Sequence, residues 1–269
     1  MPNGLKIAIC GKGGVGKTTV CAVWSQLFAQ DGFDVLALDA DSNPNLALAF
    51  GMPAESMPEP LIEMSDLIEQ RTGAKKGAVG QYFKMNPQVA DLPERYSKEI
   101  EGVKLLVLGS IDQAGSGCAC PEGAFLKALL SHSILHRKEM ILVDLEAGVE
   151  FLGRASVQGV DALVVVLEPG RRSIETALNI KKMAEEMSIK HIGCIINKIV
   201  EDSQIEVVKE QLGGMFILGG LKYDTSVQEA DLQRQAVFAA NPHLVTSLKQ
   251  AKETLMNRFF PDRISGASL

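Results

Sequence analysis

The sequence predicts an α/β fold in which a doubly wound, mostly parallel sheet of seven to eight strands carries helices on both faces. Seven short aliphatic runs alternate with amphipathic segments, and each run is apolar at successive positions instead of at every second one. Strands that helices cover on both sides have this pattern. The repeated alternation of strand and helix then predicts the doubly wound arrangement.

The expected elements can be placed along the chain. The clearest helix is Thr18–Ala29, because its apolar residues repeat at helical spacing and Gly32 follows its end. Ser173–Met187 shows the same spacing. The runs that we expect to form strands are Leu5–Cys10, Val35–Leu38, Lys104–Leu108, Met140–Val143, Ala162–Leu167, His191–Ile196 and Phe216–Leu221.

The length favours one large domain. A chain of 269 residues is enough for one large α/β domain or two small ones, and no low-complexity linker divides it. We expect a single domain over residues 1–262 and a tail over 263–269. Residues 51–102 are rich in proline, methionine and charge, and we interpret them as an excursion from the sheet with a helix at Leu61–Arg71. Such excursions often carry partner contacts.

Composition narrows the possible functions. The net charge is −6, whereas a nucleic-acid-binding protein usually carries a basic face. Five cysteines, an odd number, argue against a disulfide framework and for a reducing compartment. No apolar run approaches the roughly 18 residues of a membrane span, and residues 1–6 show no signal-peptide pattern. We therefore expect a soluble, cytoplasmic protein with no membrane span and no nucleic-acid partner.

A glycine-rich loop follows the first expected strand and opens the first expected helix. Its sequence, GKGGVGKTT from Gly11 to Thr19, satisfies the P-loop pattern in the context that the pattern requires. Glycines allow backbone N–H groups to converge on phosphate oxygens, Lys17 places a charge on the β- and γ-phosphates, and the Thr18 hydroxyl reaches Mg²⁺. The residues expected to bind the nucleotide are Gly13, Gly14, Val15, Gly16, Lys17, Thr18 and Thr19.

A second lysine, Lys12, narrows the group of P-loop proteins that the loop indicates. With it the loop resembles the deviant Walker A signature, K-G-G-x-G-K-[ST], of MinD, ParA, ArsA and the nitrogenase iron protein. This resemblance implies the P-loop NTPase fold of the MinD and iron-protein kind, hydrolysis of ATP with Mg²⁺, and an ATP-bridged homodimer. In such a dimer Lys12 reaches the partner's nucleotide. The alternative is a solvated surface lysine.

Acidic residues follow two of the expected strands. Asp39 and Asp41 come after Val35–Leu38, at the sheet edge where α/β folds bind ligands. The resemblance implies that Asp41 orients the attacking water and that Asp39 supports it, the alternative being two carboxylates that cap a turn. Asp144 follows the run Met140–Val143 in the manner of a Walker B acid and should hold Mg²⁺ through a water. Gly148 would sense the γ-phosphate through its N–H group.

Two further positions are expected at the adenine. Asn197 ends the run Ile192–Ile196, and an amide at that place can donate and accept along one edge of the base. A turn-forming asparagine is the alternative. The segment around Lys222 lies where these ATPases wrap backbone around the adenine.

A Cys-x-Cys pair is the second informative motif. Cys118 and Cys120 stand in a glycine-rich segment, and Pro121 suits the first position of a helix that continues from Phe125 to Leu135. A helix N-terminus lowers the pKa of a nearby thiol and favours the metal-binding thiolate. Two cysteines are half of a tetrahedral site, so a twofold dimer would complete it. Incidental thiols are the alternative.

Together, four motifs resemble the CooC/AcsF family over nearly the whole chain. They are the P-loop with Lys12, C-x-C-P-E at Cys118–Glu122, D-x-E-A-G-x-E at Asp144–Glu150 and E-P-x-x-x-S-I at Glu168–Ile174. That family comprises ATPases that insert nickel into carbon monoxide dehydrogenase and acetyl-CoA synthase. The resemblance implies that Cys118 and Cys120 bind Ni²⁺, or Zn²⁺ in its place, between two subunits, and that the partner is such a nickel enzyme.

The remaining cysteines and a histidine pair are assigned structural roles. Cys10, Cys21 and Cys194 stand in apolar strand or helix contexts and are expected in the core. His132 and His136 are four apart, a spacing that can bind metal, but no third ligand is evident and we favour surface or packing roles.

Two other functions compete with nickel insertion. A MinD/ParA-type positioning ATPase would need a basic patch or a basic amphipathic C-terminal helix, whereas Leu244–Phe260 carries mixed charge and Pro261 follows it. An iron-protein-like electron donor would hold an Fe–S cluster between subunits. Its ligand cysteines lie far apart in sequence, so the close spacing of Cys118 and Cys120 argues against it.

Overall fold

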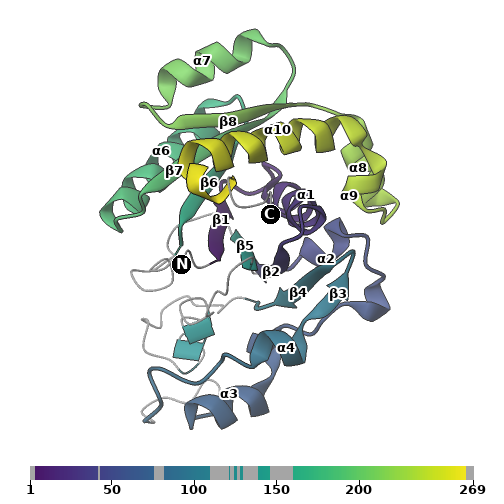
Figure 1. Cartoon of the computed structure of the whole chain (residues 1–269), viewed down its shortest axis with the longest axis vertical. Coiled ribbons are helices and arrows are strands. Elements are labelled where there is room, and N and C mark those ends of the chain that lie inside the picture. Colours follow the sequence, from purple (N-terminus) through teal and green to yellow (C-terminus); the bar gives the residue numbers. More distant parts are fainter. Residues whose placement is uncertain are drawn as a thin grey trace.

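The computed structural model describes residues 4–41, 43–75, 82–109, 121, 124, 125, 128, 129, 139–145 and 160–264. In this part of the chain, an eight-stranded sheet has the order β3-β4-β2-β5-β1-β6-β7-β8 (Figure 1). Every neighbouring pair is parallel except β3 with β4. The strands are β1 Leu5–Cys10, β2 Asp34–Ala40, β3 Lys98–Ile100, β4 Val103–Val107, β5 Glu139–Leu145, β6 Ala162–Leu167, β7 His191–Ile199 and β8 Phe216–Lys222.

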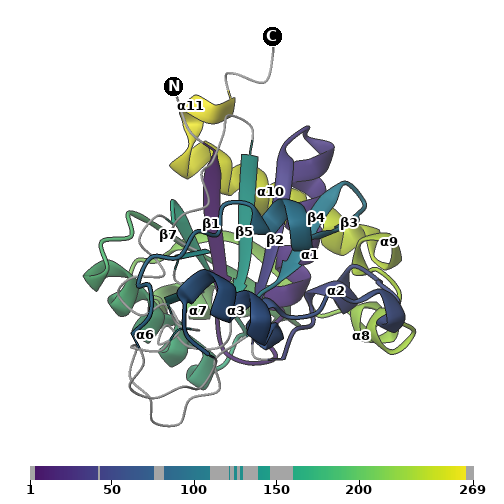
Figure 2. The same ribbon diagram turned by 90° about the horizontal axis from the view of Figure 1, so that it is seen from below.

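Helices cover both faces of the sheet, which confirms the predicted fold class (Figures 1 and 2). One buried cluster joins α1, α2, α9 and α10 to the sheet, and the other joins α3, α4, α6 and α7 to its opposite face. The helices are α1 Lys17–Gln30, α2 Leu46–Ala49, α3 Ser65–Thr72, α4 Leu92–Tyr96, α6 Arg171–Glu186, α7 Ser203–Gln211, α8 Thr225–Leu232, α9 Val237–Ala240, α10 Pro242–Phe259 and α11 Pro261–Ile264, with short 3₁₀ turns η1 Ala54–Ser56 and η2 Leu61–Glu63. Within the described ranges, no helix has the length and apolar character needed to cross a bilayer.

Two features of the sheet edges were not predicted. The sequence analysis missed β3, a three-residue strand whose lysine and glutamate are exposed and which pairs antiparallel with β4 through a turn at Glu101 and Gly102. The run that forms β8 was expected to be covered by helices on both faces, but Phe216 and Gly220 of this strand are exposed, as is Lys222 at its end. β8 is the last strand of the sheet, so one of its edges has no neighbouring strand.

The helix predicted over Leu61–Arg71 is divided in two. η2 ends at Glu63, Met64 has ψ 78°, and α3 begins at Ser65. In the first turn of the segment, the Ile62 N–H donates to the carbonyl of Leu108, just after β4, at 3.1 Å. This contact holds the start of the segment against the sheet, and α3 begins after the break at Met64.

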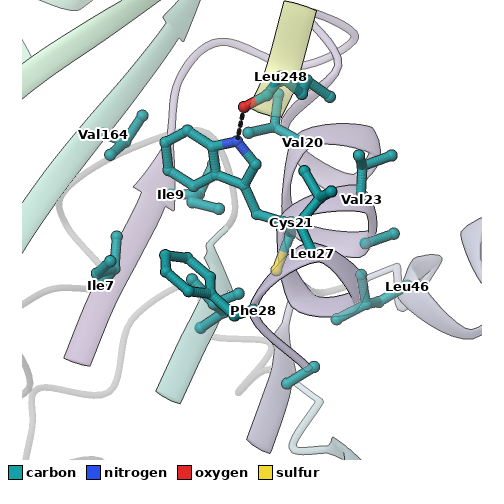
Figure 3. Close-up of a cluster of buried hydrophobic side chains, with 14 of the residues drawn as sticks. Ile7, Ile9, Val20, Cys21, Val23, Leu27, Phe28, Leu46, Val164 and Leu248 are labelled. Atoms are coloured by element: carbon teal, nitrogen blue, oxygen red, sulfur yellow. Dashed lines mark hydrogen bonds between the residues drawn. The ribbon is translucent and has the colours of Figure 1, made fainter. Parts of the chain in front are cut away.

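Helix α1, which follows the glycine-rich loop, is held in place by contacts with α10. The Trp24 indole N–H of α1 donates to the Leu248 carbonyl at 2.9 Å, and both residues are fully buried (dashed line in Figure 3). One turn later Lys252 forms an ion pair with Asp31 and lies 5.1 Å from the centre of the Phe28 ring. These contacts hold α1 against α10 and so fix the direction from which its first turn meets the sheet edge.

The order of the strands creates a crevice at the end of β1. β1 lies between β5, which leads to β2 and β4, and β6, which leads to β7 and β8. The chain therefore leaves β1 at the point where the winding of the sheet changes direction. Open α/β sheets bind ligands at the carboxyl ends of the strands at this point.

Candidate functional site

A cavity of about 670 Å³ opens at this edge of the sheet. Its walls are the glycine-rich loop and start of α1, the loop after β2, the ends of β7 and β8, and residues of α8 and the start of α10. The volume is in the range of small-molecule and cofactor sites. Most of the predicted nucleotide-binding residues line it: Gly13, Gly14, Gly16, Lys17, Thr18, Thr19, Asp41, Asn197 and Lys222.

The shape of the loop depends on glycine at two positions. Gly11 has φ +147°, and a Cβ atom there would lie 2.1 Å from the Val166 carbonyl oxygen. Gly16 has φ +97° and is the N-cap of α1, and its Cβ would lie 2.4 Å from the Asn197 amide nitrogen. No side chain caps α1, so the first N–H groups of this 14-residue helix are available to an anion.

The two lysines of the loop lie in different environments. Lys17 is 6% exposed, and its Nζ lies 3.5 Å from the Lys12 carbonyl, the outer limit of a hydrogen bond. A buried ammonium is costly unless an anion compensates it, and a phosphate in the cavity would do so. Lys12 is exposed and is not among the residues that line the cavity of its own chain.

Asp144, at the end of β5, is a fully buried carboxylate. Among the described residues neither of its oxygens has a hydrogen-bond partner of acceptable geometry. Burial raises the pKa of Asp144 from 3.8 to about 7, and the carboxylates of Asp39 and Asp41 add to the rise. The Thr18 hydroxyl and the Lys17 ammonium oppose it. Two orphaned carboxylate oxygens beside a threonine hydroxyl suit a hard cation such as Mg²⁺, which prefers oxygen ligands.

Asp39 organises the loop that carries Asp41. It is fully buried, lies beside Asp144 in the β2–β5 register, and accepts from the N–H groups of Leu46 at 2.8 Å and Asp41 at 3.2 Å. Burial raises the pKa of Asp39 to about 6. Asp41 lines the cavity and accepts from the Asn43 N–H at 2.9 Å. Both carboxylates therefore cap turns, and Asp41 in addition reaches the cavity.

Asn197 contacts the glycine-rich loop through its side chain. Its Nδ2 donates to the Val15 carbonyl at 2.7 Å, and its Oδ1 accepts from the Lys198 N–H at 2.8 Å. The side chain also lines the cavity. The structure thus shows a loop-holding role that the sequence analysis did not consider, and the adenine contact stays a prediction.

The far wall of the cavity is formed by the segment after β8. Lys222 forms an ion pair with Asp202. Asp224 caps α8 by accepting from Ser226, and buried Asn241 donates to it at 2.8 Å. Asn241 was missed, although Asn before Pro242 is a recognisable helix-start signal. It also caps α10, so one amide joins the starts of two helices beside the cavity.

The comparison with protein families identifies the fold and its nucleotide. The CbiA family, described as the CobQ/CobB/MinD/ParA nucleotide binding domain, matches residues 6–237. The chain belongs to this family. It is accordingly a MinD/ParA-type ATPase, and the prediction of a P-loop ATPase is confirmed.

Two relatives cover most of this ATPase. The carbon monoxide dehydrogenase accessory protein CooC of Rhodospirillum rubrum is 38% identical over 96% of the chain and 98% of its own length. An ATP-binding protein of Methanocaldococcus jannaschii is 44% identical over 84% of the chain and 88% of its own length. The resemblance to the CooC group is confirmed.

Solved structures show the same fold. The cell division protein MinD of Aquifex aeolicus has a TM-score of 0.66 at 20% identity, over 94% of the chain and 98% of its own. MinD of Pyrococcus horikoshii, solved with Mg-ADP, has a TM-score of 0.66 at 19% identity, over 97% of each chain. A ParA family ATPase of Chlorobium tepidum reaches 0.68 at 18% identity, over 94% and 99%.

Several predicted residues of this ATPase lie outside the described ranges. They are Cys118, Cys120, His132, His136 and Gly148. The helix predicted after the cysteine pair is partly described: Pro121, Ala124, Phe125, Ala128 and Leu129 are helical and buried, at the spacing of one helix face. Cys10, Cys21 and Cys194 are buried, and burial raises the pKa of each thiol, which confirms their place in the core.

Proposed function

We propose that this ATPase is a nickel-insertion factor for carbon monoxide dehydrogenase or acetyl-CoA synthase, and that it acts as an ATP-bridged homodimer. The relation to the R. rubrum accessory protein carries the proposal, because 38% identity extends over 96% of the chain and 98% of the relative. The likeness to MinD and ParA structures does not compete with it. At 18–20% identity that likeness shows the fold alone.

The residues around the cavity support the proposed binding and hydrolysis of ATP. The triphosphate lies against the first N–H groups of α1, and the Lys17 ammonium compensates its β- and γ-phosphate charge. Thr18 and Asp144 would hold Mg²⁺, which neutralises charge on the phosphates when it is bound. Asp41, kept in place by the caps that Asp39 provides, orients the water that attacks the γ-phosphorus.

The second half of the mechanism requires two chains. Lys12 is exposed and is not part of its own cavity wall, which suits a contact with the partner's nucleotide. In the dimer, Cys118 and Cys120 of each chain supply four thiolates to one nickel ion, the cargo. Gly148 senses the γ-phosphate, so hydrolysis loosens the dimer and releases the metal to the client enzyme.

Metal content after removal of the cysteine pair tests the proposal. The double variant Cys118→Ser/Cys120→Ser should lose one nickel or zinc ion per dimer and keep its affinity for ATP. Cys194→Ala is the matched control, because it removes a buried thiol of β7 and should leave the metal content unchanged. Inductively coupled plasma mass spectrometry of the dimer fraction with ATP measures the metal.

Three outcomes would contradict nickel insertion. An unchanged metal content in the double variant would exclude the bridging thiolates. An iron–sulfur chromophore in the purified protein would favour an electron donor. A dimer that binds no metal, and that does not increase the activity of nickel-free carbon monoxide dehydrogenase or acetyl-CoA synthase given Ni²⁺ and ATP, would favour a positioning ATPase.

A further inference from the structure

Two consecutive side chains at the end of β7 contact the same short stretch of the phosphate loop. Asn197 Nδ2 donates to the Val15 carbonyl at 2.7 Å, and Lys198 Nζ donates to the Gly14 carbonyl at 2.7 Å. Successive residues of a regular strand point to opposite faces of the sheet. The strand must therefore change its conformation here for both side chains to reach one loop.

The change lies at Lys198 itself. Its φ is +57°, in the left-handed region, and the pairing of β7 with β8 shifts register between Ile196 and Ile199. A long side chain seldom adopts this conformation, because its Cβ crowds the backbone. Such strain persists where the surrounding structure holds it, and it gathers at functional sites.

The two contacts fix the direction of two peptide groups. In a trans peptide the carbonyl and the following N–H point in opposite directions. Holding the Gly14 carbonyl outward therefore orients the Val15 N–H, and holding the Val15 carbonyl orients the Gly16 N–H. The Val15 N–H makes only a 3.5 Å contact with the Lys12 carbonyl, so a phosphate oxygen can replace this partner.

A carboxylate from a third strand holds the lysine in place. Glu168 follows β6, and its Oε1 lies 2.6 Å from the Lys198 ammonium. The Glu168 backbone N–H in turn donates to the Ser173 hydroxyl at 3.0 Å, near the start of α6. Lys198 thus bridges the end of β6 to the phosphate loop, with about two thirds of its side chain shielded from solvent.

We propose that Lys198 is a positioning residue of the nucleotide site. It tethers the Gly14 carbonyl, with Glu168 as its anchor, and thereby presets the loop N–H groups for the phosphates of the nucleotide before the nucleotide binds. The proposal rests on nucleotide binding by this domain, which the family shows, and on the place of the phosphates at this loop proposed above, and not on the nickel cargo. In this proposal Lys198 affects the binding of the phosphates and not the binding of the base.

Lys198→Gly separates positioning from a purely structural role. Glycine accepts the left-handed conformation without strain, so folding of the nucleotide-free chain should not suffer greatly while the tether is lost. The matched control is Glu101→Gly, which removes a long charged side chain at φ +49° in the turn between β3 and β4. The control should change stability in the same way and leave nucleotide affinity unchanged.

The ligands in calorimetric titrations are ATP and inorganic tripolyphosphate, each with Mg²⁺. Loss of a hydrogen bond to a charged group should weaken both by about tenfold in Lys198→Gly. Equal losses place the effect on the phosphates. An unchanged affinity for both ligands, or a loss for ATP without a loss for tripolyphosphate, would overturn the proposal, as would a loss of equal size in Glu101→Gly.

Three further variants test the proposal if glycine disturbs the fold. Lys198→Met retains the length of the side chain and removes its charge, and it should lose affinity for both ligands. Glu168→Gln retains the lysine but weakens its anchor, so its loss should be smaller. Lys198→Arg should recover part of the affinity because it restores a donor. If Lys198→Met and Glu168→Gln both bind tripolyphosphate as tightly as the unmodified chain, Lys198 does not position the loop.

Discussion

Three charged residues of the site, Lys17, Asp39 and Asp144, are buried. Asp144 has two orphaned oxygens within the described structure, Asp39 lies beside it in the sheet, and Lys17 is almost fully covered. Charges in such surroundings cost stability unless a partner compensates them. The nucleotide and its cation are the partners that would do so, so these buried charges favour ligand binding at a cost to the stability of the nucleotide-free chain.

Asp144→Asn should make the nucleotide-free chain more stable above neutral pH. Burial raises the pKa of Asp144 from 3.8 to about 7, so the folded state keeps a proton that the unfolded chain releases. The free energy of unfolding therefore falls as the pH rises from about 4 to about 7. Three pH units correspond to roughly 4 kcal/mol at most, and we expect a gain of a few kcal/mol at pH 8 that disappears near pH 4.

Urea unfolding in EDTA at pH 5, 6, 7 and 8 measures this gain. Addition of Mg²⁺ and ATP should reverse the order of the two proteins, because the ionised carboxylate then has its cation. If the difference in unfolding free energy between the unmodified chain and Asp144→Asn does not vary with pH, Asp144 is ionised in the nucleotide-free protein.

Sequence patterns predicted this site where the chemistry lies in a contiguous motif. The phosphate loop follows β1, Asp41 follows β2, and Asp144 is the last residue but one of β5. The apolar runs of these strands are evident in the sequence, and the carboxyl ends of parallel strands meet at one edge. The contacts of Asn197 and Lys198 with the loop could not be predicted, because they join residues more than 180 positions apart. No sequence pattern predicts that the backbone of Lys198 adopts the left-handed conformation.

At the scale of elements, buried parallel strands were predicted and irregular edges were not. β1 and β6 have the predicted bounds, since both are buried along their whole length and apolar except at Lys6 of β1. The edge strand β3 is short and partly charged, so its pairing with β4 depends on the turn between them. The segment before α3 is joined to the end of β4 by a hydrogen bond from Ile62 to Leu108, a long-range contact that no local pattern encodes.

The contact between α1 and α10 should contribute to stability without contributing to catalysis. Trp24→Phe removes the hydrogen bond to Leu248 and leaves a small void in a fully buried cluster (Figure 3). We expect the free energy of unfolding to fall by about 1–3 kcal/mol. Denaturation followed by circular dichroism measures it, because Trp24 is the only tryptophan. The KM for ATP should stay unchanged, and a raised KM would show that α10 controls the loop.

At the scale of the whole molecule, the cavity proposed to bind the nucleotide opens at one edge of the sheet, and Lys12 is exposed and does not line it. Two buried clusters, one on each face, leave this edge as the place where loops from β1, β2, β7 and β8 converge. A second chain that approaches the edge meets the nucleotide and the exposed lysine together. Dimerisation should therefore require both ATP and Lys12.

Lys12→Ala tests this requirement in a background where ATP persists. In the proposed mechanism Asp41 orients the attacking water, so Asp41→Ala should slow hydrolysis, and sedimentation velocity with Mg²⁺ and ATP should then show mostly dimer. Asp41→Ala/Lys12→Ala should remain monomeric under the same conditions, because the charge that bridges to the partner's phosphates is gone. The matched control, Asp41→Ala/Lys190→Ala, removes an exposed lysine just before the amino end of β7, at the opposite edge, and should still dimerise. A dimer without Lys12, or a dimer formed equally well without ATP, would mean that the two chains meet through some other surface.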